Sequence, residues 1–120
     1  MDITATIAAL KKRPDFAANV GMMLIHNGGV SGWTRHDHAT VTAVEVTPDR
    51  ARIEEIRQEF LTSPGIYEII VEANEGRLEP GDDLLFILVA GDIREHIKPV
   101  LAELLDRIKA EAVSKKELSS

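Results

Sequence analysis

The chain has 120 residues and no cysteine, and its 14 basic and 20 acidic residues give a formal net charge of −6. This length suits one domain, expected over residues 1–120, while the acidic balance argues against nucleic acid and membrane surfaces as partners, and the lack of cysteine excludes disulfides and thiolate chemistry. No run approaches the roughly 20 apolar residues of a membrane span and no signal-peptide pattern opens the chain, so we expect a soluble, cytoplasmic protein.

The first half of the chain predicts two helices and two strands around a long loop. Residues 3–12 predict a helix capped by Asp2. The apolar run 20–25 predicts a buried strand, and the glycine-rich stretch 26–38 predicts a long loop. Residues 39–46 are rich in β-branched side chains and predict a second strand. Pro48 then predicts the first residue of a helix that ends near residue 62.

The second half predicts two more strands and a long helix. Residues 66–73 alternate and predict a strand with one wet face, and the apolar run 83–89 predicts a central strand. Asp92 and Glu95 form a capping-box pattern ahead of a helix whose apolar side, from Ile93 onward, faces the core. The resulting order of elements favours the α+β class, with helices packed on a mostly antiparallel sheet.

Three lysines, Lys109, Lys115 and Lys116, are expected to close this last helix, before a few frayed residues. Cations at a helix C-terminus gain about 0.3–1 kcal/mol from the helix dipole, which accounts for them without any function. A nucleophilic lysine would need desolvation or a neighbouring cation. The residues alone leave both interpretations open.

The long loop carries two further candidates, each with a simpler explanation. His36, Asp37 and His38, with His26 upstream, suggest a metal site, but a site needs three or four ligands in fixed geometry, so solvated loop residues are favoured and no metal is expected. Gly28 and Gly29 can bring backbone N–H groups close to an anion, although a turn is the first use of glycine.

Three stretches, taken together and in order, resemble one known family. EGRLEPGDDLLFILVAG at 75–91 is similar to a G-x-L-x-x-G-D pattern followed by an apolar strand, and VGMMLIHNGGV at 20–30 is similar to a glycine-led strand ending in G-x-V. The terminal helix leading into VSKKE at 113–117 is similar to a lysine-bearing ending. Over about residues 19–117 the chain resembles the MoaE family, the large subunit of molybdopterin synthase.

The resemblance implies an α/β hammerhead fold, a homodimer, and a small ubiquitin-like partner whose C-terminal Gly-Gly tail carries a thiocarboxylate. Sulfur would pass twice to cyclic pyranopterin monophosphate, a pterin phosphate, without a metal or organic cofactor. The resemblance implies that Lys109, with Lys115 or Lys116, serves the transfer pocket. The residues expected to bind the substrate are Gly28, Gly29, Arg35 and Arg94.

The chain also departs from the family pattern. Ser31, Asn74 and Ile93 stand where the family has arginine or histidine, and the acids Glu75 and Asp92 are expected to repel an anion. Each lost arginine–phosphate hydrogen bond removes roughly 1.5–3 kcal/mol. Two hypotheses therefore stay open, a divergent synthase subunit and a non-catalytic relative that acts as a binding module, beside an unrelated small α+β domain.

Overall fold

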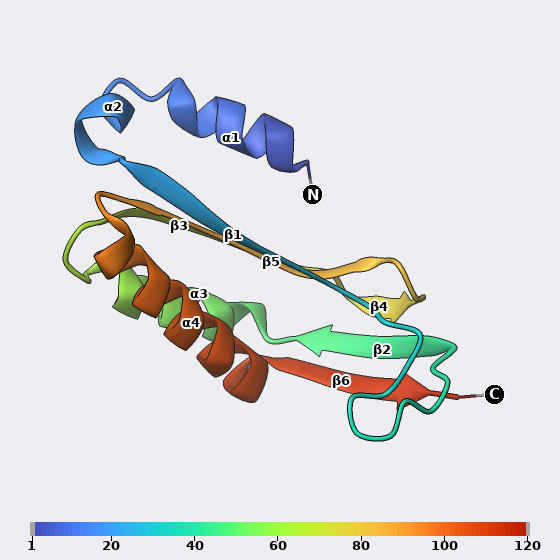
Figure 1. Cartoon of the computed structure of the whole chain (residues 1–120). Coiled ribbons are helices and arrows are strands. Elements are labelled where there is room, and N and C mark those ends of the chain that lie inside the picture. The colour runs from blue at the N-terminus through green and yellow to red at the C-terminus, as the bar shows by residue number, and fades with distance from the viewer. Residues whose placement is uncertain (1, 120) are drawn as a thin grey trace.

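The computed structural model describes residues 2–119 and confirms the α+β class. Ten helices and strands lie within the described residues and form two antiparallel sheets of three strands each (Figure 1). In chain order they are α1 Ile3–Lys11, α2 Phe16–Asn19, β1 Met22–Gly29, β2 Ala43–Pro48, α3 Arg50–Leu61, β3 Ile66–Ala73, β4 Gly76–Leu78, β5 Asp83–Gly91, α4 Arg94–Glu111 and β6 Val113–Leu118.

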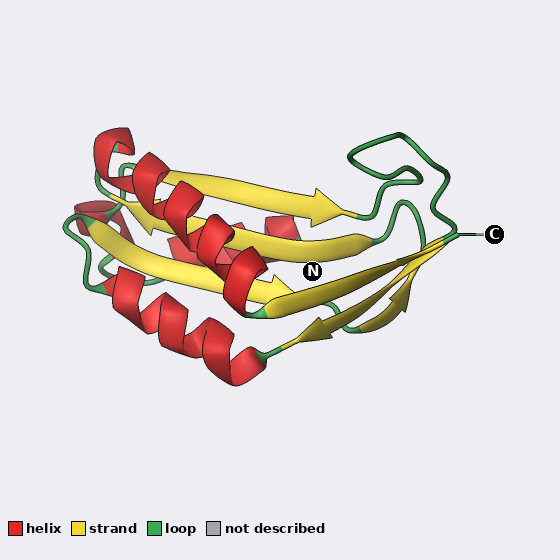
Figure 2. Ribbon diagram, turned by 90° about the horizontal axis from the view of Figure 1, so that it is seen from below, coloured by secondary structure: helices red, strands yellow, loops and turns green. Residues whose placement is uncertain are grey.

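The larger sheet has the strand order β1-β5-β3, so the prediction of a central strand at 83–89 is confirmed. Its apolar run is continuous because helices cover both faces of the sheet (Figure 1). Ile87 and Val89 pack towards α3 and α4, whereas Phe86 and Leu88 pack towards α1. Figure 2 views this sheet from the side that carries α3 and α4.

The predicted wet face of β3 is wrong for the same reason. The register with β5 shifts between Ile66 and Glu68, which places Tyr67 and Ile70 against the α1 side. Ile69 is fully buried on the opposite face, beneath α3 and α4. A strand with helices on both sides has no solvent-facing row of its own.

The smaller sheet has the order β4-β2-β6 and lies at one end of the molecule. Residues 113–118, expected to finish the last helix and fray, instead form β6 and pair with β2 along its whole length. Lys115 and Lys116 therefore stand on a strand, and the helix dipole does not explain them. Ser120 lies outside the described residues.

Helix starts follow the predictions only in part. Asp2 caps α1 as expected, with its side chain accepting a hydrogen bond from Ala5 N. Pro48 ends β2 instead of opening α3, and Asp49 is the cap of that helix. The predicted turn at Pro80-Gly81 is present, and Gly81 takes a φ of 96° there, which favours glycine.

The start of α4 corrects the predicted capping box. The cap residue is Ile93, without a side-chain cap bond, and its side chain is 48% exposed instead of buried. The Asp92 carboxylate accepts hydrogen bonds from Ile93 N at 2.6 Å and lies 2.7 Å from His96 Nδ1. None of the described helices is both long and apolar enough to cross a membrane.

Candidate functional site

A cavity of about 220 Å³ opens where the last turn of α4 meets both sheets. β1 and β5 supply one wall, the loop after β1 supplies an arginine, and the end of α4 and the start of β6 supply the two lysines. We call it the basic cavity. Its lining residues are His26, Gly28, Gly29, Arg35, Leu84, Leu85, Lys109, Val113 and Lys115.

Three cations meet in the basic cavity, Arg35, Lys109 and Lys115, and none of the described lining residues is acidic. Such an arrangement attracts an anion, because neighbouring positive charges in a partly enclosed site reinforce one another. The prediction that Glu75 and Asp92 repel an anion from this pocket is wrong. Glu75 lies 3.7 Å from Arg50 in an exposed ion pair, and Asp92 lines a different cavity.

Strand alternation separates the two neighbouring lysines. Val113 and Lys115 share one face of β6 and both line the basic cavity. Lys116 points to the opposite face, in register with Glu45 of β2. Lys115, and not Lys116, is the lysine that the fold brings together with Lys109.

His26 is a cavity residue that the sequence reasoning placed in a solvated loop. β1 continues through Gly29, so His26 and Gly28 lie on the same face, two residues apart. A Cβ on Gly28 would lie 2.6 Å from His26 Nε2, so the imidazole occupies the space that this glycine leaves free. The continuing period of two along β1 is the signal that could have found it.

The surroundings of His26 disfavour the charged form of its imidazole. Burial, followed by the positive charge of Lys109, lowers the pKa of His26 below the usual histidine value. Its Nε2 is buried and has no hydrogen-bond partner among the described residues. A buried polar atom without a partner is uncommon in folded proteins, so a hydrogen-bonding group of a ligand is one partner that this atom could take.

A second hollow of about 190 Å³ adjoins the basic cavity and shares Arg35, Lys109 and Lys115 with it. We call it the outer compartment. Its other lining residues come from the loop after β1 and from β6, and the sequence reasoning singled out none of them as binding residues. They are Ser31, Trp33 and Glu117.

Arg94, a predicted substrate-binding residue, and the histidine-rich loop, considered as a metal site and not favoured, do not join this cavity. Arg94 lies in the first turn of α4, about 22 Å along the helix axis from Lys109, and its Nε is 3.1 Å from Glu95. The histidine-rich loop forms no metal site, because no group of three His, Cys, Asp or Glu among the described residues could hold an ion. His38 instead stacks on Trp33.

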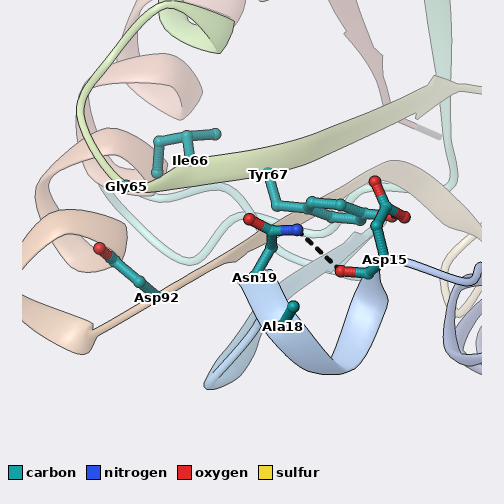
Figure 3. A pocket seen from close by; sticks show the side chains of 7 residues that line it. All are labelled: Asp15, Ala18, Asn19, Gly65, Ile66, Tyr67 and Asp92. Atoms are coloured by element: carbon teal, nitrogen blue, oxygen red, sulfur yellow. Dashed lines mark hydrogen bonds between the residues drawn. The ribbon is translucent and has the colours of Figure 1, made fainter.

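A larger hollow of about 620 Å³ lies at the start of β3, away from the basic cavity (Figure 3). Its polar groups already bond one another. Tyr67 donates to the Asp15 carboxylate at 2.5 Å, which raises the pKa of Tyr67, and the Asn19 amide donates to the Asp15 carbonyl at 2.8 Å. Its described lining carries the acids Asp15 and Asp92 and no cation, so it does not suit an anionic ligand.

Comparison with known proteins gives one family match and several solved structures. The family described as MoaE protein matches residues 1–111. The MoaE protein of molybdopterin biosynthesis from Burkholderia ambifaria is 25% identical, over 99% of this chain and 78% of that chain, with a TM-score of 0.78. No curated protein matches the chain significantly.

Two further structures are similar in fold. Molybdopterin synthase from Staphylococcus aureus is 20% identical over 84% of this chain and 76% of that chain, with a TM-score of 0.73. A complex of subunits 1 and 2 of molybdopterin-converting factor from Helicobacter pylori is 15% identical over 98% and 79%, with a TM-score of 0.72.

Proposed function

The chain belongs to the MoaE protein family, and from that premise we propose that it is a molybdopterin synthase large subunit in molybdenum cofactor biosynthesis. It takes sulfur from a thiocarboxylated small subunit and delivers it to cyclic pyranopterin monophosphate. The observation that carries the proposal is the convergence of Arg35, Lys109 and Lys115 on one cavity with no acidic side chain among its described lining.

The roles of the side chains follow from their charges and positions. Lys109 and Lys115 hold and neutralise the two anions that must approach each other, the substrate phosphate and the thiocarboxylate tail. Arg35 offers the planar fork that pairs with phosphate. Gly28 and Gly29 form a wall of the cavity beside these cations without side chains of their own, and the imidazole of His26 fills the space beside Gly28.

A small ubiquitin-like subunit is the partner that this function requires. The two-subunit structure from Helicobacter pylori, which shares this fold, supports such a partner. A narrow, basic cavity between two sheets suits a thin Gly-Gly tail that ends in an anion. A homodimer and a cytoplasmic location belong to the same proposal and rest on the family alone.

Reconstitution tests the proposal. The purified chain, a thiocarboxylated small subunit and cyclic pyranopterin monophosphate should together form molybdopterin, measured as its stable fluorescent oxidation product. An established family member run beside it shows that the reagents are competent. If the established member forms product and this chain forms none, the catalytic proposal fails.

A non-catalytic binding module is the second candidate, and one observation favours it. Ser31 lines the outer compartment at the position where the resemblance expects an arginine, and its hydroxyl, which carries no charge, donates to the Trp33 carbonyl at 2.9 Å. This reading predicts that the small subunit binds in calorimetry while reconstitution forms no product.

A further inference from the structure

A single exposed aromatic side chain stands at the rim of the cationic site. Trp33 is the only tryptophan of the chain, and it is 47% exposed. It lines the outer compartment, into which Lys109 and Lys115 also project. Ligand sites commonly combine such an apolar surface with a few convergent polar groups.

Hydrogen bonds within the loop fix the backbone on which Trp33 stands. Trp33 pairs with Thr40 in an isolated antiparallel bridge, and Thr34 N donates to the Ala39 carbonyl at 2.9 Å. The Ser31 hydroxyl bonds the Trp33 carbonyl from the other side. The loop that follows β1 in Figure 1 is therefore a folded structure that presents this residue.

His38 supports the indole from behind. The two rings stack with centroids 4.6 Å apart and planes 17° from parallel. His38 takes a φ of 55°, a left-handed conformation that is uncommon for a residue other than glycine. Backbone strain of this kind persists where the surrounding structure enforces it, and it clusters at functional sites. Here it places one ring behind another, so that the indole is a firm surface.

We propose that Trp33 stacks against the planar ring of the ligand while Arg35, Lys109 and Lys115 hold its phosphate. The ligand class is a planar nitrogen heterocycle that carries a phosphate, and this inference rests on the proposed function and deepens it. The three cations are common to the basic cavity and the outer compartment, so a phosphate bound among them borders the compartment that Trp33 lines. Trp33 is thus a specificity-determining residue.

Two probes separate the ring from the phosphate. Neopterin monophosphate carries both groups, and ribose 5-phosphate carries the phosphate without an aromatic ring. Isothermal titration of the full chain should give a tighter Kd for neopterin monophosphate. Trp33→Ala should raise that Kd about tenfold, a usual effect of losing one aromatic stacking partner, and should change the Kd of ribose 5-phosphate less than about twofold.

Matched variants control the measurement. Trp33→Phe should keep part of the preference for the ring. Ile93→Ala removes a second large exposed apolar residue of the described chain, 48% exposed at the start of α4 and far from Lys109, and should leave both dissociation constants unchanged. Trp33 is the only tryptophan of the chain. Tryptophan emission should therefore change when neopterin monophosphate binds and stay constant with ribose 5-phosphate.

Each other outcome counts against a defined claim. Equal binding of neopterin monophosphate by wild type and Trp33→Ala overturns the stacking role and leaves the proposed function standing. Equal weakening of both probes overturns it too, since the loop would then only shape the cavity. If the wild type binds neither probe, the stacking role fails, and the reconstitution reaction decides separately whether the proposed function stands.

Discussion

Gly28 is the position where one added methyl group tests the geometry of the basic cavity. An alanine Cβ there would lie 2.6 Å from His26 Nε2 and 3.3 Å from its Cε1. Comfortable contacts start near 3.5 Å, so the imidazole must move by roughly 1 Å. The next nearest atom, the Leu85 carbonyl oxygen, is 3.5 Å away, so β5 can stay in place.

The expected magnitudes nearly cancel in stability but not in binding. Replacing glycine by alanine inside a strand stabilises by about 0.5–1 kcal/mol, and an imidazole forced off its rotamer costs about 0.5–1.5 kcal/mol. Gly28→Ala should therefore change the free energy of unfolding by less than about 1 kcal/mol. It also pushes the ring into a cavity of about 220 Å³, so the Kd of neopterin monophosphate should rise several-fold.

A double-mutant cycle with His26→Ala isolates this contact. In the His26→Ala background the new methyl group meets no imidazole. There, Gly28→Ala should raise the free energy of unfolding in urea by about 0.5–1 kcal/mol. An identical effect of Gly28→Ala in both backgrounds would show that the new methyl group and the imidazole do not interact, contrary to the geometry above.

Three further predictions concern stability and charge. Hydrogen bonds from Arg107 and then Arg52 lower the pKa of Glu111 from 4.5 to about 2. The ionised Glu111 therefore stabilises the folded state fully above pH 4.5, and this stabilisation is lost as the pH falls through about 2. Glu111→Gln should flatten the decline of Tm at acid pH, and an unchanged decline would contradict this. Leu104→Ala, at a fully buried position, should lower the urea-measured unfolding free energy by about 2–5 kcal/mol, and a loss below about 1 kcal/mol would count against the core described. Arg35→Ala should weaken ribose 5-phosphate binding about tenfold in calorimetry, and unaltered binding would remove Arg35 from the site.

The central sheet could be predicted because its signals are local. The apolar run of β5 and the alternation of β3 each mark a strand, and the structure places β3 at the predicted residues 66–73. β6 could not be predicted from VSKKEL, because lysine and glutamate are depleted in strands. Its pairing with β2, about 70 residues earlier in the chain, overrides that preference. The assignment of residues 1–120 to one domain stays a prediction.

Only the site residues that the family resemblance pointed to could be predicted from the sequence. Lys109 was singled out from the resemblance, but the choice between Lys115 and Lys116 needed a strand, since only a period of two sends neighbours to opposite faces. His26 was missed because Gly28 and Gly29 read as a turn, whereas the structure keeps them in β1. Trp33 was missed because no local pattern shows where a long loop returns to the body of a protein.

The most direct test of the account compares Lys115→Ala with Lys116→Ala in the reconstituted synthase reaction. The two variants lose the same charge from neighbouring positions on β6, so they differ in the face of the strand from which the charge is lost. We predict that Lys115→Ala lowers the rate of molybdopterin formation at least tenfold, as expected for one lost charge-assisted hydrogen bond, while Lys116→Ala stays within about twofold of wild type. Equal losses in the two variants, or a larger loss in Lys116→Ala, would contradict the assignment of sulfur transfer to the basic cavity.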